Sequence, residues 1–181
     1  MNVTRILRVS ACLLCTALVA AAGTAIAGEP QVDAATAFEK LKALEGDWSG
    51  EITSEDHQGE PVHHTFRVSA NGSVVQEIMN EGTEHEMINM YHLDGDDLLM
   101  THYCAGGNQP RMKLDTARAT PDKLPFVYMD GTNLDPAKDG HIHAGTLVFE
   151  DDGTLDSRWI GWFEGKPMGA PTTFALKREN Q

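Results

Sequence analysis

Cysteine is scarce in this chain of 181 residues, and its placement excludes a fold stapled by disulfides. Only three cysteines occur, and Cys12 and Cys15 lie in an apolar N-terminal run that we expect to be removed. Cys104 would then be the only thiol, so no intramolecular disulfide could form. The fold must depend on packing, and we interpret Cys104 as a buried core residue, with a reactive thiol as the alternative.

Positive charge is also scarce. The chain has 14 Lys and Arg against 27 Asp and Glu, which gives a formal net charge of -13. Residues 1–27 hold two of the basic residues and none of the acidic ones, so the rest of the chain carries a net charge of -15. A surface this negative repels nucleic acid and anionic membranes, and we therefore expect neither as a partner.

The chain also lacks a hydrophobic run long enough for a comfortable membrane span. The apolar N-terminal run, residues 10–23, is shorter than the roughly 20 residues that a spanning helix needs. Arg5 and Arg8 give a positive charge to the segment before this run. Ala25-Ile26-Ala27 follows the run and matches the A-x-A pattern of a signal-peptidase site. This predicts a cleaved signal peptide over residues 1–27 and a periplasmic or secreted protein, with an uncleaved anchor as the alternative. Residues 28–181 are then a single domain that has no membrane contact after cleavage.

What the chain does contain is one helical pattern followed by many strand patterns. Phe38, Leu41 and Leu44 recur at helical spacing, which predicts an amphipathic helix over residues 34–44. After Gly46 the hydrophobic period changes to two, and turn residues recur about every ten positions. Strands are predicted at 48–54, 61–70, 73–80, 84–93, 97–104, 109–116, 126–129, 141–150, 154–163 and 170–178. The pattern predicts an all-β fold, a closed antiparallel up-and-down barrel of about ten strands with one short N-terminal helix.

The segment Gly-Asp-Trp-Ser-Gly at residues 46–50 directly follows the predicted helix. A Gly-x-Trp in this place resembles the first strand of calycin or lipocalin-like barrels, and the chain looks like secreted bacterial barrels of uncharacterised function. The resemblance implies a container in which Trp48 closes the base and packs against a basic residue of the last strand, Arg178 or Lys177. It extends distantly to nitrobindin-like haem-binding barrels, whose haem-ligating His lies near the C-terminus. This chain departs from them, because no His follows His143.

A container implies a ligand, and we expect a small apolar or amphipathic molecule that is bound without catalysis. Met90, Met100, His102, Tyr103 and Arg111 are the residues that we predict at the barrel interior or its mouth. Methionine adapts to irregular ligands, although it also fills irregular cores. Arg111 follows a Gly-Gly loop and offers a fork of donors for an acidic head group, or for an acid of the protein's own surface.

Histidine and cysteine spacing supports a second hypothesis. Side chains two apart share one face of a strand, so His102 pairs with Cys104 and His141 pairs with His143. If the two strands were neighbours, these four residues would form a zinc or copper site, or a haem site, although we predict no cofactor. Cys104 and His102 could also act as nucleophile and base of a small cavity enzyme. A barrel with a filled core that acts through its surface is the remaining alternative.

Overall fold

The computed structural model describes residues 31–54 and 57–179. The signal peptide predicted over residues 1–27 lies outside the described residues, so it stays a prediction. Within the described part of the chain, no helix has the length and apolar character needed to cross a membrane.

The one α-helix of the described residues, α1, spans Ala34–Lys42, which is two residues shorter than predicted. The carboxylate of Asp33 caps its N-terminus by accepting a hydrogen bond from the Thr36 amide at 2.7 Å. One face is buried, with Phe38 and Leu41 at its centre, and Leu44 is buried just beyond the last turn. The helix contacts β2 (Pro61–Ser69), β4 (Met87–Asp94) and β5 (Asp97–Tyr103), so its apolar face covers one end of the sheet.

The strands form one antiparallel sheet that closes on itself, which confirms the predicted fold class. The other strands are β1 (Gly46–Ile52), β3 (Val74–Met79), β6 (Gln109–Leu114), β7 (Lys123–Thr132), β8 (His141–Phe149), β9 (Leu155–Phe163), β10 (Lys166–Pro167) and β11 (Thr172–Arg178). The pairings run from β11 through β1 to β8 in chain order, and β9 joins β8 to β11. Ten strands therefore make the barrel, because the two-residue β10 pairs with β9 alone.

One strand is longer than the sequence suggested. β7 was predicted at residues 126–129 but spans Lys123–Thr132, with Pro125 inside it. The proline is tolerated near the beginning of the strand because it removes only one donor, and its carbonyl still accepts a hydrogen bond from the Asp115 amide at 2.8 Å. The polar residues after Met129 continue as strand because they pair with the first residues of β6.

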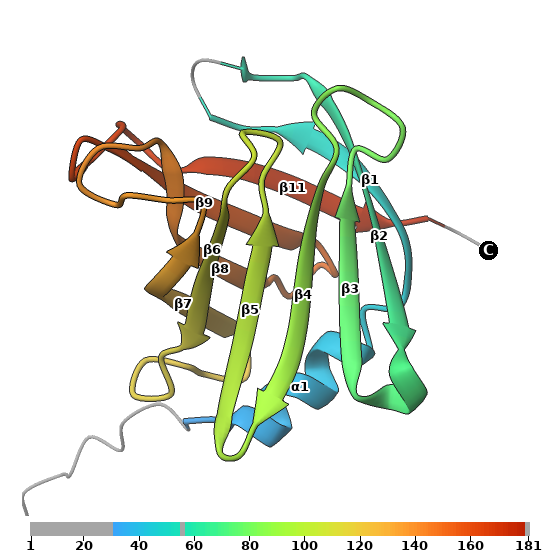
Figure 1. Ribbon diagram of the computed structural model, residues 1–181. Helices are drawn as coiled ribbons and strands as arrows, with labels where there is room; N and C mark the ends of the chain where they lie inside the picture. The colour runs from blue at the N-terminus through green and yellow to red at the C-terminus, as the bar shows by residue number, and fades with distance from the viewer. Residues whose placement is uncertain (1–30, 55–56, 180–181) are drawn as a thin grey trace, which may run out of the picture.

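The half of the barrel nearest α1 is filled with side chains. Figure 1 shows α1 lying across this end, whereas loops that connect the strands lie at the opposite end. The wholly buried side chains here belong to Leu41, Phe66, Tyr91, Leu98, Met100, Met112, Leu114, Leu124, Phe126, Leu147 and Leu155. Burial of this apolar set supplies the main stabilising free energy in a chain that has no disulfide among its described residues.

Trp48 and Arg178 join the first strand, the last strand and the helix end. The two residues are directly paired between β1 and β11, and the guanidinium lies 4.6 Å from the centre of the indole ring. Trp48 Nε1 donates to the Leu44 carbonyl at 2.9 Å, and Arg178 donates to the carbonyls of Glu45 at 2.5 Å and Ala43 at 2.7 Å. A cation at the C-terminus of a helix meets the negative end of its dipole, so this contact stabilises the closed end of the barrel.

Candidate functional site

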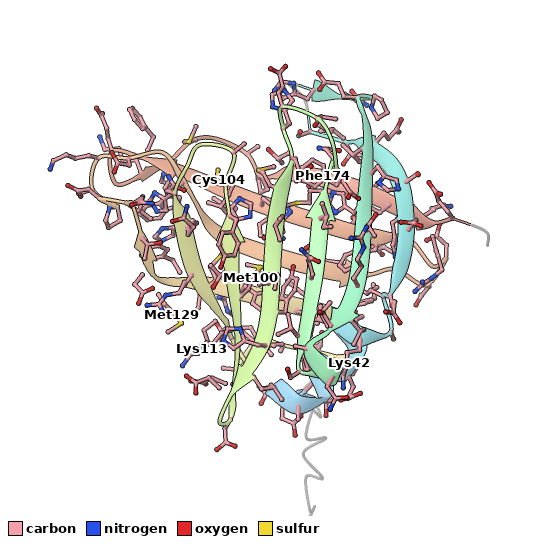
Figure 2. All side chains as sticks on the ribbon, turned by 45° about the vertical axis from the view of Figure 1, so that its right-hand side comes forward. Lys42, Met100, Cys104, Lys113, Met129 and Phe174 are labelled. Atoms are coloured by element: carbon pink, nitrogen blue, oxygen red, sulfur yellow. The ribbon has the colours of Figure 1, made fainter. Side chains whose placement is uncertain are left out.

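The half of the barrel opposite α1 contains a cavity of about 580 Å³. Its walls come from the strand ends and loops farthest from the helix. The apolar lining includes Met79, Met87, Ile142, Trp159, Met168 and Phe174, and the polar lining includes Ser54, His57, His102, Cys104, His141 and Thr172. Figure 2 shows Cys104 and Phe174 near this end, with Met100 deeper in the barrel and Lys42 at the far end. The volume and the mixed lining match those of sites for small organic molecules.

Trp159 belongs both to the packed core and to the lining of the cavity. Its ring lies against Gly145 on the neighbouring strand β8, where an added Cβ would come within 2.5 Å of the indole. Its Nε1 donates to the Ser157 hydroxyl at 2.8 Å, and its ring stacks on His102 with centroids 5.9 Å apart. Glycine at position 145 therefore allows the indole to lie against β8, where it forms part of the cavity floor.

A buried polar network lies behind this floor, centred on Glu77 of β3. The Glu77 carboxylate accepts hydrogen bonds from His64 Nδ1 at 2.8 Å, Asn89 Nδ2 at 2.7 Å and the Tyr91 hydroxyl at 2.6 Å. All four side chains are buried. Burial alone would raise the pKa of Glu77, but the hydrogen bonds and the charge interaction with His64 outweigh it and keep that pKa below its usual value. Glu77 is therefore an ionised group inside the barrel.

His102 connects this network to the cavity. Its Nδ1 lies 2.7 Å from Asn89 Oδ1, and the side chain is almost fully buried at 1 % exposure. Burial lowers the pKa of His102 to about 4, although the nearby Glu77 charge acts in the opposite direction. The imidazole is neutral at physiological pH. Its Nε2 is buried without a hydrogen-bond partner, on a side chain that lines the cavity.

The predicted ligand-binding residues are divided between the two faces of the barrel wall. His102 lines the cavity, and Met100 points inward two residues earlier, where it is part of the filled core. Tyr103 follows His102 and is exposed, because neighbouring side chains on a strand point to opposite faces. Met90 lies between the inward-facing Asn89 and Tyr91, so the same alternation places it on the outer face. Arg111 is also exposed, and it forms a two-pronged ion pair with Asp130.

The four residues of the predicted metal set are not brought together as one group. Their strands, β5 and β8, are separated in the sheet by β6 and β7. His102, Cys104 and His141 line the cavity, whereas His143 does not. Among the described residues, no group of three or more His, Cys, Asp or Glu side chains is arranged to hold a metal ion.

His141 and His143 interact with each other instead. A bulge in β8 brings His141 Nε2 within 3.0 Å of His143 Nδ1, and His141 Nδ1 lies 2.9 Å from the Asp139 carbonyl. That carbonyl can only accept, so His141 Nδ1 carries a proton and donates it to the carbonyl. His143 is stacked between Tyr128 and Trp162, with centroids 4.7 and 3.8 Å away. Burial and the neighbouring His141 lower the pKa of His143.

The buried polar network around Glu77 was not predicted from the sequence. Glu77 stands in an otherwise largely apolar strand, Val-Val-Gln-Glu-Ile-Met, at an inward position of the period-two pattern. Asn89 and Tyr91 occupy the inward positions of the next strand. An acidic residue on the apolar face of a predicted strand was the available signal, because a charge is buried only with partners.

Comparison with known proteins adds little to this geometry. No family model matches the chain, and no curated protein matches it either. Among solved structures, the crystal structure of Rv2717c from M. tuberculosis is similar over 80% of this chain and 98% of that chain. The sequence identity is 17% and the TM-score is 0.49. The site is therefore interpreted from its own residues.

Proposed function

We propose that this protein is a binding barrel, delivered to the periplasm or the cell exterior, that holds a small apolar or amphipathic molecule without catalysing its conversion. The observation that carries this proposal is the cavity of about 580 Å³ at the end of the barrel away from α1. Protein interiors are normally filled to crystal-like density with few voids larger than a water molecule. A barrel that packs one half and leaves the other hollow has room for a ligand.

The cavity lining supports an apolar or amphipathic ligand. Three methionines, Met79, Met87 and Met168, face it together with the rings of Trp159 and Phe174. Methionine side chains are flexible and polarisable, and they adapt to ligands of different outline. The aromatic rings add broad apolar contact, while the few polar groups would orient the ligand.

The protonation chemistry of His102 favours binding over catalysis. A general base works best when its pKa lies near the operating pH. Burial holds the pKa of His102 at about 4, so this imidazole is a weak proton acceptor for the Cys104 thiol at neutral pH. It remains a good hydrogen-bond acceptor.

Filling the cavity tests the proposal, and β4 offers a matched pair of methionines. Met87 lines the cavity, whereas Met90 lies on the outer face of the same strand. The probe is N-phenyl-1-naphthylamine, a neutral and largely apolar dye with one amine N–H, whose fluorescence rises in apolar surroundings. We expect the wild-type protein and Met90→Trp to bind the dye and to melt at a higher temperature in its presence. Met87→Trp should weaken binding at least about tenfold, because the indole occupies the ligand volume.

Native mass spectrometry on protein purified from its source cells complements this experiment, because it would reveal a co-purified ligand. The proposal fails if the wild-type protein neither binds the dye nor carries a ligand. It also fails if Met87→Trp, folded as judged by circular dichroism, binds as well as Met90→Trp.

A further inference from the structure

We propose that the cavity selects neutral ligands that carry a hydroxyl or N–H hydrogen-bond donor, and that the lone pair on His102 Nε2 receives this donor. The inference rests on the proposed function, and it specifies the chemistry of the ligand. It arises from the direction of the buried hydrogen bonds, which can be traced from Glu77 to the cavity in three steps.

The first step is the orientation of the Asn89 amide. An ionised carboxylate can only accept hydrogen bonds, so the Asn89 group that lies 2.7 Å from Glu77 Oε2 must be the donating NH₂. The Tyr91 hydroxyl donates to the same oxygen, and His64 Nδ1 lies against the other one. The carboxylate thus orients every group around it, and the Asn89 carbonyl oxygen is turned toward His102.

The second step is the tautomer of His102. The Asn89 carbonyl oxygen can only accept, and it lies 2.7 Å from His102 Nδ1, so the imidazole proton is on Nδ1. In the neutral ring Nε2 then bears a lone pair and no proton. The sequence of hydrogen bonds from His102 through Asn89 to Glu77 therefore fixes Nε2 as an acceptor.

The third step is that this acceptor lacks a hydrogen-bond donor. His102 Nε2 is buried and has no protein partner in the described structure, although its side chain lines the cavity. A buried polar atom without a hydrogen bond costs about 1–3 kcal/mol, and a ligand donor in the cavity would relieve that cost. A hydroxyl, an amide N–H or an amine N–H would do so.

The same geometry disfavours anionic ligands. A carboxylate would place its oxygen lone pairs against the lone pair of Nε2, and the two would repel each other. No lysine or arginine is among the described residues that line the cavity. Arg111, for which an acidic head group and a surface acid of the protein were both considered as partners, lies on the outer face and is paired with Asp130.

Isomeric ligands test the inference directly. Decan-1-ol and methyl nonyl ether contain the same atoms, but only the alcohol has a donor. We would measure how well each displaces N-phenyl-1-naphthylamine from the purified protein, with decanoate as the anionic member of the set. We expect the alcohol to bind about tenfold more tightly than the ether, which corresponds to one net hydrogen bond. Decanoate should displace the dye least at neutral pH.

Two matched histidine variants locate the effect. In His102→Phe the ring shape is kept and the acceptor is lost, so the alcohol and the ether should bind with affinities within about twofold of each other. His92→Phe makes the same replacement on the outer face of β4 and should keep the tenfold preference. Because His102→Phe also removes the partner of Asn89 and could fail to fold, ¹⁵N chemical shifts of the wild-type histidines provide a second readout. These shifts should show that Nδ1 of His102 is protonated and that Nε2 is not.

The outcomes separate this inference from the proposed function. Equal displacement by the alcohol and the ether, tight binding of decanoate, or a proton on Nε2 would overturn the donor-ligand inference and leave a barrel that binds apolar molecules. If the dye itself does not bind, both fail together. A preference for the alcohol that survives in folded His102→Phe would assign the acceptor to another residue and would also contradict the inference.

Discussion

His102 combines three properties that rarely coincide in one side chain. It is almost fully buried, it lines a cavity, and its Nε2 has no partner in the described structure. Such a group normally finds a protein partner, and exceptions require an explanation. Its neighbour in the chain, Tyr103, is exposed, because consecutive side chains of a strand point to opposite faces of the sheet.

The neutral state of His102 makes stability depend on pH. Its pKa is about 4 in the folded protein, against an ordinary value near 6.5, so the unfolded chain binds more protons between these values. Stability should therefore be unaffected by this group above about pH 6.5 and should fall as the pH drops toward 4, by about 3 kcal/mol. His143, whose pKa is also lowered, acts in the same direction.

Urea unfolding of the wild-type protein and His102→Phe at several pH values measures this effect. Carboxylates titrate in the same range, so the quantity of interest is the difference between the two proteins. The variant should lose less stability than the wild type between pH 6.5 and 4, and His92→Phe should follow the wild type. Parallel curves for wild type and His102→Phe would contradict the assignment of a buried neutral imidazole.

Among the elements, the contact between β1, β11 and the end of α1 joins the first and last strands of the barrel to the helix. Arg178 lies over the Trp48 ring and donates to two carbonyls at the end of the helix. Lys177, one residue earlier, points to the other face and has only a 3.4 Å ion pair with Asp152, both side chains being well exposed. The two basic residues therefore differ in what they contribute.

Alanine substitutions should separate them. Arg178→Ala removes the cation over the indole and two helix-end hydrogen bonds, so we expect the free energy of unfolding to fall by about 1–2 kcal/mol. Lys177→Ala removes one exposed ion pair and should change it by less than about 0.5 kcal/mol. Denaturant unfolding checks both, and equal losses would show that Arg178 acts only as a surface charge.

At the scale of the whole molecule, the barrel has two ends with different packing. Around α1 the interior is a filled core, and at the other end the barrel surrounds the cavity. Regions with fewer buried apolar contacts open more readily, so the two ends should differ in local stability.

Hydrogen exchange measures this difference. Amides at the filled end, such as those of Leu98 and Met100, should exchange more slowly than amides that border the cavity, such as those of Ile142 and Thr172. Addition of N-phenyl-1-naphthylamine should slow exchange mainly at the cavity end, because the ligand supplies the missing contacts there. Uniform exchange along the barrel, or protection by the dye at the α1 end, would contradict a divided interior.

The barrel could be predicted because its information is local. Period-two hydrophobicity after Gly46, regularly spaced turn residues and one helical segment specify short antiparallel strands, and closure follows from the need to protect edges. The start of β7 was predicted three residues too late because proline usually interrupts a strand, whereas Pro125 lies near the beginning of β7, where it is tolerated.

The site residues were predictable only in part. His102 and Cys104 share a face by alternation, but the sequence does not say which face is inside, so Met90, Tyr103 and Arg111 were chosen with them although they lie on the outer wall. The distance between β5 and β8 depends on the order of the intervening strands, which placed His102 and His143 in different surroundings.

The sequence by itself determined a ten-stranded barrel with a helix at its start, because hydrophobic period and turn chemistry act between neighbours in the chain. Tertiary structure alone decided that the interior is half filled and half hollow, and that Glu77, Asn89 and His102 form one directed chain of hydrogen bonds. Volume and hydrogen-bond direction are properties of side chains brought together from separate strands. They exist only once the barrel has closed.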